Sequence, residues 1–186
     1  KGKVIDTYED KVKVGYKLDK VENFPLTITE NEESNVIKVF YIKDEEQVKD
    51  ISYTVKYFIE NKEQEADRKV ITETVWVNAE ETMTFDATLL EKEYVGYKQV
   101  GTNPETVGTT VTNGDVISVY YEKDETQTKQ IQYTVKYYIN NEEQESDRKE
   151  ITETVWINAE ETMTFDATLL DKEYVGYKKV GTNPET

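Results

Sequence analysis

The stretch ITETVWVNAEETMTFDATLLEKEYVGYK at residues 71–98 returns at residues 151–178 as ITETVWINAEETMTFDATLLDKEYVGYK. It belongs to a longer repeat, because residues 51–106 and 131–186 are identical at 47 of 56 positions with a constant offset of 80. A long period copied this faithfully is typical of a tandem array of small domains. One copy of an active site normally suffices in an enzyme, so the repeat favours a structural or binding function.

Shorter matches extend the same pattern toward the start of the chain. Residues 14–17 read VGYK, as do residues 95–98. The closing VISVYY of residues 116–121 has its match in VIKVFY at residues 36–41. We therefore predict five parts: residues 1–44, the second half of a diverged copy; 45–50, a linker; 51–124, a complete copy; 125–130, a linker; and 131–186, a copy without its closing strand. The chain starts at Lys1 and stops within the pattern, so we expect it to be a piece of a longer protein.

The complete copy has the hydrophobic pattern of a mainly β module. Tyr53, Val55, Tyr57 and Ile59 alternate with polar or aromatic residues, which indicates a strand with one buried face. Asp86 precedes a stretch that suits one short helical turn, with Asp86 as its N-cap. The predicted elements are strands at 53–59, 70–77 and 94–100, a strand-like segment at 82–85, a helical turn at 87–92, and a hairpin of 109–112 with 115–121 around Asn113-Gly114.

Composition excludes several classes of function. The net charge of −16 argues against nucleic acid and anionic membrane surfaces as partners. The chain has no Cys and no His, which removes thiolate chemistry and the commonest general base and metal ligand. No apolar run approaches the ~18 residues of a membrane span, so we expect no membrane insertion in this segment. No catalytic motif is present either, and we predict no enzyme activity.

Aromatic residues are the candidates for ligand contact. Trp76 and Trp156 lie on Thr-rich strands, on the face opposite to the neighbouring valines, where an exposed ring could stack on a sugar or anchor a protein. The alternative is that each indole covers the core from its edge or packs against a neighbouring module. Tyr97 and Tyr177 are further candidates, although most of the 14 Tyr have the spacing of core residues.

Two other clusters are weaker candidates for sites. The carboxylates of Glu80-Glu81 and Glu160-Glu161, with Asp86 and Asp166 nearby, could bind Ca²⁺, but their spacing matches no calcium loop, and a solvated acidic surface is expected. Lys56 and Lys136 could form isopeptide crosslinks to an Asn, but the closing strand offers none. We therefore predict no catalytic, cofactor or metal site.

Each copy is marked by an opening YTVKY, a central GYK and a closing VYY (VFY in the first copy), as far as the copy extends. In these motifs the sequence resembles the mucin-binding-protein (MucBP) type repeat and the related B repeat of internalins, which occur in tandem in surface proteins of Gram-positive bacteria. The resemblance implies a small β-grasp-like module in which the first and last strands pair centrally, and a location outside the cell, at the cell surface or cell wall.

Three hypotheses for function follow from the repeat and the resemblance. In the first, the copies form an elongated rod, the stalk of an adhesin that projects a binding head, because linkers of a few residues leave neighbouring copies in contact. In the second, each copy is a weak module for host mucin glycan or a protein ligand, and avidity supplies strength. In the third, separate chains complement each other head to tail by strand addition and form a filament of like subunits.

Overall fold

The computed structural model describes residues 2–185, and these form a mainly β protein in which the helices are 3₁₀ turns of three to five residues. One compact unit holds the residues up to 92 together with 101–120, and the other holds 93–100 together with the residues from 121 onward. The division therefore passes through the complete copy, residues 51–124.

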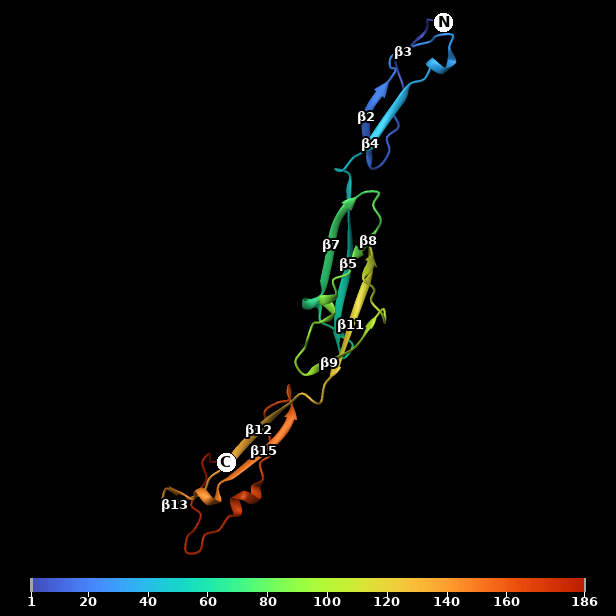
Figure 1. Ribbon diagram of the computed structural model, residues 1–186. Helices are drawn as coiled ribbons and strands as arrows, with labels where there is room; N and C mark the ends of the chain where they lie inside the picture. The colour runs from blue at the N-terminus through green and yellow to red at the C-terminus, as the bar shows by residue number, and fades with distance from the viewer. Residues whose placement is uncertain (1, 186) are drawn as a thin grey trace. The chain divides into compact units, whose positions relative to one another are not determined.

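The elements are named by their order in the chain (Figure 1). The strands are β1 (Val4–Ile5), β2 (Tyr16–Glu22), β3 (Leu26–Thr27), β4 (Lys38–Lys43), β5 (Val48–Ile59), β6 (Lys62–Glu63), β7 (Lys69–Trp76), β8 (Thr82–Thr84), β9 (Tyr97–Asn103), β10 (Thr110–Thr112), β11 (Val116–Lys123), β12 (Thr128–Val135), β13 (Tyr138–Ile139), β14 (Glu142–Glu143) and β15 (Lys149–Trp156). The 3₁₀ helices are η1 (Glu32–Ser34), η2 (Glu65–Asp67), η3 (Ala87–Leu90), η4 (Glu145–Asp147) and η5 (Ala167–Asp171).

The core of the complete copy lies on one face of β5 and β11, as the alternation predicts. Tyr53, Val55 and Tyr57 on β5 are at most 1% exposed, and Val119 and Tyr121 on β11 are at most 2% exposed. The five-stranded sheet has the order β6-β5-β11-β9, with β7 also paired to β5. β5 begins at Val48, five residues before the predicted start, so half of the predicted linker 45–50 is strand.

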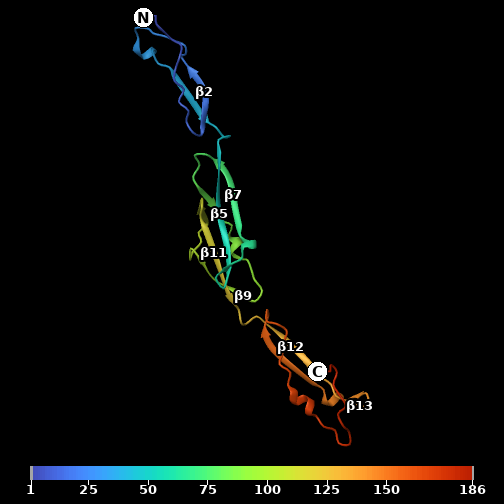
Figure 2. The same ribbon diagram turned by 180° about the vertical axis from the view of Figure 1, so that it is seen from behind.

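The first and last strands of the complete copy are central neighbours. The Gly114 N–H donates to the Ser52 carbonyl at 2.7 Å, and the Thr54 N–H donates to the Asp115 carbonyl at 2.9 Å. The residue numbers of the bonded groups rise together, from Ser52 to Thr54 on one strand and from Gly114 to Asp115 before the other, as in a parallel pair. β11 lies beside β5 in both views (Figures 1 and 2).

The predicted hairpin around Asn113-Gly114 is wrong. The turn exists, but β10 pairs with β8, with Val111 opposite Met83, while β11 joins the five-stranded sheet. The Asp115 N–H closes the turn by donating to the Thr112 carbonyl at 3.0 Å, but beyond this point the two arms separate, because Asn113 is bonded to the surroundings of the turn. The Asn113 N–H donates to the Glu81 carbonyl, and the Asn113 Oδ1 accepts from the Ser52 N–H, both at 2.8 Å.

Two smaller predictions have different outcomes. The helical turn is confirmed as η3, whose N-cap Asp86 accepts a hydrogen bond from the Thr88 N–H at 3.0 Å. The third strand begins at Tyr97 rather than Tyr94, because the backbone turns first. Gly96 has φ of +85°, which favours glycine, and the Tyr97 N–H donates to the Tyr94 carbonyl at 3.0 Å.

Residues outside the complete copy form smaller sheets. β1 pairs with β3, β2 with β4, β12 with β15 and β13 with β14. Within residues 2–185, β12 has no partner other than β15, whereas its counterpart β5 lies between β7 and β11. Its inward residues are correspondingly less buried: Ile131 is 9% exposed against 1% for Ile51, and Tyr133 is half-buried where Tyr53 is buried.

Candidate functional site: the junctions at Trp76 and Trp156

Each of the two compact units contains one junction between residues of successive copies. The first junction consists of residues 13–17, 43–47 and 76–78, and the second consists of residues 94–98, 123–127 and 156–158. Each is built on the tetrapeptide VGYK, whose glycine has a positive φ, +86° at Gly15 and +85° at Gly96. This conformation turns the backbone so that its carbonyl groups face the next copy.

The tryptophan and an asparagine of the following copy donate to this turn. In the first junction the Trp76 indole N–H donates to the Gly15 carbonyl at 3.1 Å, and the Asn78 Nδ2 donates to the Val14 carbonyl at 2.7 Å. In the second, the same bonds occur at the same distances, from Trp156 to Gly96 and from Asn158 to Val95. Both pairs of bonds join residues at least 60 positions apart.

An ordered turn at residues 44–47, where the predicted linker begins, completes the junction. The Asp44 N–H donates to the Gly15 carbonyl, and the Gln47 Oε1 accepts from the Gly15 N–H, both at 2.8 Å. The Gln47 carbonyl in turn accepts from the Val77 N–H at 2.8 Å, next to Trp76. Gln47 therefore bonds to both sides of the junction.

Gln127 and Asp124 repeat this arrangement at the second junction. The Gly96 N–H donates to Gln127 Oε1, the Asp124 N–H to the Gly96 carbonyl and the Ile157 N–H to the Gln127 carbonyl, each at 2.8 Å. The same three bonds therefore surround the glycine and glutamine of both junctions.

Aromatic and cationic groups enclose each tryptophan. Tyr16 meets Trp76 edge to face with ring centroids 5.5 Å apart and an interplanar angle of 86°, and Lys43 Nζ lies 5.1 Å from the indole centroid. Tyr97 and Lys123 surround Trp156 in the same way, at 5.5 Å and 5.0 Å. Edge-to-face rings and a cation over an indole are both attractive arrangements.

Both junction glycines lie where no side chain fits. A Cβ on Gly15 would lie 2.8 Å from Trp76 Cζ2 and overlap Asn78 Nδ2. A Cβ on Gly96 would meet Trp156 and Asn158 in the same way. Gly176 has the same backbone conformation, with φ of +83°, and nothing within 4 Å of its Cβ position. The chain thus contains two packed copies of the turn and one open copy.

Linker carboxylates are held in their charged form. The hydrogen bond from the Gln47 amide, with Lys17 farther away, lowers the pKa of Asp44 below its ordinary value. The pKa of Asp124 is lowered first by the hydrogen bond from the Thr126 hydroxyl and then by that from the Gln127 amide. Both carboxylates therefore accept hydrogen bonds within the junction at neutral pH.

Hydrogen bonds and a ring pair cross each junction and stabilise it. In the first junction three hydrogen bonds join the following copy to the turn and linker, those of Trp76, Asn78 and Val77. At about 1 kcal/mol net for each bond and about 1 kcal/mol for the ring pair, these contacts contribute a few kcal/mol before the cost of ordering the two sides is subtracted.

Of the four predicted contact residues, three belong to the junctions. Trp76, Trp156 and Tyr97 are half-buried there, whereas Tyr177 is 57% exposed beside the open glycine. Asn78, Asn158, Gln47 and Gln127 were missed. Their recurrence at an offset of 80 is the signal that could have identified them, but it is shared with most of the repeat.

Four of the six carboxylates in the acidic clusters, and both lysines, have structural partners, whereas Glu80 and Glu160 are exposed. Glu81 lies 2.8 Å from Lys49 Nζ, Glu161 lies 3.1 Å from Lys129 Nζ, and Asp86 and Asp166 cap 3₁₀ helices. Among residues 2–185 no group of three or more acidic side chains is arranged to hold a metal ion. Lys56 and Lys136 lie beside Glu63 and Glu143, at 3.7 Å and 3.5 Å, rather than beside an asparagine.

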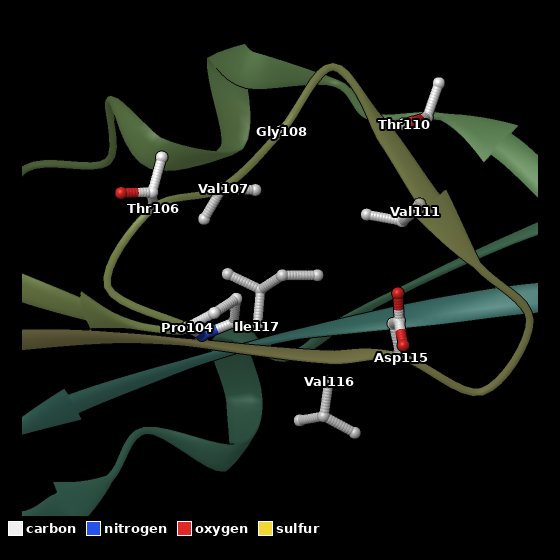
Figure 3. A pocket seen from close by; sticks show the side chains of 9 residues that line it. All are labelled: Pro104, Thr106, Val107, Gly108, Thr110, Val111, Asp115, Val116 and Ile117. Carbon is white, nitrogen blue, oxygen red and sulfur yellow. The ribbon is translucent and has the colours of Figure 1, made fainter.

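A small cavity in the complete copy is a second candidate. Figure 3 shows the loop of residues 104–110 arching over the start of β11, with Val107, Val111 and Ile117 around the space. Its volume is about 250 Å³. Asp115 is the one charged group among the lining residues, and it accepts a hydrogen bond from the Thr112 N–H at 2.7 Å. A single engaged carboxylate provides no acid–base pair, so the cavity has the properties of a packing defect under a loop.

Comparison with protein-family models, curated proteins and solved structures finds no match to this chain. In the part of the chain that the structure describes, no helix has the length and apolar character needed to cross a membrane.

Proposed function

We propose that this chain is part of an extended stalk, a non-catalytic spacer at a bacterial cell surface that holds a binding head away from the cell wall. The observation that carries the proposal is the junction itself. The same donors meet the same acceptors in both junctions, with matching distances of 3.1 and 2.7 Å. A spacer requires a connection of this kind, because an array with loose linkers would collapse into a coil.

The resemblance to MucBP-type repeats supports the same assignment, including the β-grasp-like module and the location outside the cell. The central position of the first and last strands, β5 and β11, agrees with that type of module. A short linker that is hydrogen-bonded at both ends favours copies strung in a rod. The high negative charge adds to this, since like-charged neighbouring stalks repel one another.

The glycan-binding hypothesis depends on the aromatic rings predicted as ligand contacts, and the junctions already use three of those four: Trp76, Trp156 and Tyr97. Each indole N–H is donated to a backbone carbonyl of the same chain. A sugar would have to stack on a ring that a tyrosine and a lysine already contact. This favours the spacer over the adhesive module.

Small-angle scattering on the 186-residue chain tests the proposal. A compact domain of this length has a radius of gyration of about 16 Å, and a stalk segment has a value well above that. The matched variant Trp76→Phe/Trp156→Phe keeps a ring in each junction and removes its hydrogen bond. We expect it to broaden the distribution of interatomic distances. A radius near 16 Å for the unaltered chain would refute the spacer. Saturable binding on a glycan array, lost in the double variant, would instead favour the adhesive module.

A further inference from the structure

The turn that leads into β11 carries a reactive dipeptide. Asn113-Gly114 is the only Asn-Gly pair in the sequence. In such a pair the glycine nitrogen can attack the asparagine side-chain carbon, because glycine has no Cβ to obstruct the approach. Ammonia leaves and a five-membered succinimide forms. Water then opens the ring to aspartate or isoaspartate, with a net gain of about 1 Da.

In the folded copy both reacting groups are engaged. The attacking nitrogen, that of Gly114, donates its hydrogen to the Ser52 carbonyl at 2.7 Å. The Asn113 amide is held at both ends, since its Oδ1 accepts from the Ser52 N–H at 2.8 Å and its Nδ2 donates to Glu81 Oε2 at 3.4 Å. Ring closure requires the nitrogen to lose its hydrogen and the side chain to rotate. Neither can happen until the turn leaves β5.

We propose that Asn113 is a deamidation site and that docking of its turn on β5 prevents the reaction in the folded copy. Once β11 has separated from β5, Asn113 can convert, and the converted turn no longer docks on β5. Modification of Asn113 would therefore record that the copy has opened. It would act at the pair of strands that forms the centre of the core.

The second half of the proposal follows from the surroundings of the side chain. Aspartate at position 113 has no hydrogen to donate to Glu81 and places a second carboxylate where the amide donor was, 3.4 Å from the first. Like charges at this distance repel, and Lys49, 2.8 Å from Glu81, offsets only one of them. Isoaspartate also lengthens the backbone within the turn. The Asn113 N–H and the Gly114 N–H are then too far apart along the chain to bond to the Glu81 and Ser52 carbonyls at the same time.

Peptide mapping by mass spectrometry tests the closed state. The full chain is incubated in one mildly alkaline buffer with and without urea, and conversion at position 113 is followed with time. We expect conversion in the folded chain to be about 100-fold slower, since only the opened fraction reacts. Asn78 and Asn158, each followed by alanine, serve as internal controls, and in urea they should convert much more slowly than Asn113 because the alanine Cβ obstructs ring closure. Equal rates with and without urea would overturn the first half of the proposal.

A pair of substitutions tests whether conversion blocks docking. Asn113→Asp should lower the urea midpoint of the complete copy, and adding Glu81→Gln should restore part of the loss, because a glutamine amide can donate to the new carboxylate. Glu161→Gln, at the equivalent position of the following copy, is the matched control and should restore nothing. An Asn113→Asp chain as stable as the unaltered one, or equal restoration by both glutamines, would overturn the second half.

Discussion

The junction glycines give the sharpest prediction, because the chain contains its own control. Gly96→Ala and Gly176→Ala make the same change in the same VGYK tetrapeptide at almost the same φ, +85° and +83°. Alanine in this conformation costs about 1–2 kcal/mol at either position. Only at Gly96 does the new Cβ also meet a neighbour, because it would lie 2.9 Å from Trp156 Cζ2 and overlap Asn158 Nδ2.

The additional loss of folding free energy in Gly96→Ala comes from the hydrogen bonds that the new Cβ breaks. Asn158 and Trp156 have to move away, and each loses a hydrogen bond of about 1 kcal/mol. We therefore expect Gly96→Ala to destabilise the chain by about 3–4 kcal/mol and Gly176→Ala by about 1–2 kcal/mol.

Fluorescence is a direct assay because the only two tryptophans of the chain, Trp76 and Trp156, both lie in junctions. Gly96→Ala should shift about half of the emission to longer wavelength before the fold is lost, whereas Gly176→Ala should leave the emission unchanged. Equal destabilisation by the two substitutions, or unchanged emission in both, would refute the reasoning.

Two further predictions concern acid and fragments. Asp44 and Asp124 have a folded pKa below the ordinary value of 3.8, so their contribution to junction stability is complete above that pH and is lost as pH falls through the folded pKa. Tryptophan emission should therefore stay constant from neutral pH to about pH 4 and shift below it. An Asp44→Asn/Asp124→Asn chain that shows the same acid shift would contradict this. Residues 51–124 should melt cooperatively alone because they include β11 and the buried part of β5, from Ile51 onward. Residues 131–186 should not, since Ile131 and Tyr133 lack the covering strand. Circular dichroism of the two fragments decides, and a cooperative monomeric melt of the second fragment would show the strand assignment to be wrong.

Sequence alone predicts the elements in which one face is buried. Tyr53, Val55 and Tyr57 alternate with outward residues because a strand places successive side chains on opposite faces, and the structure buries them accordingly. The N-cap role of Asp86 can also be predicted from the sequence, because an N-cap is a local interaction, here between residues two positions apart.

The failures concern interactions between distant residues. Asn113-Gly114 forms its turn as expected, but the partner of β10 is decided by the burial of Met83 and Val111 about 30 residues apart, which no local pattern encodes. For Trp76 the sequence left open ligand contact, covering of the core edge or packing on a neighbouring module, and the structure shows the packing. The bond from Trp76 to Gly15 spans 61 residues, and alternation on β7 indicates only that the indole leaves the core face. The short linker predicts that neighbouring copies lie in contact, but the polar residues of that segment do not indicate which bonds they make: Gln47 accepts from the Gly15 N–H, and its amide donates to Asp44.

The central claim is that a junction fixes the orientation of successive copies, and a distance distribution across one junction tests it most directly. The chain has no Cys, so two spin labels can be placed without background, at the exposed positions Asp19 and Thr72 on either side of the first junction. A second pair at Thr72 and Glu91, within the complete copy, measures the width that the labels contribute themselves. We predict that electron–electron double resonance gives one narrow distribution for the first pair, nearly as narrow as for the second, and that Trp76→Phe/Asn78→Ala broadens only the first. A distribution across the junction that is already broad in the unaltered chain would contradict the account.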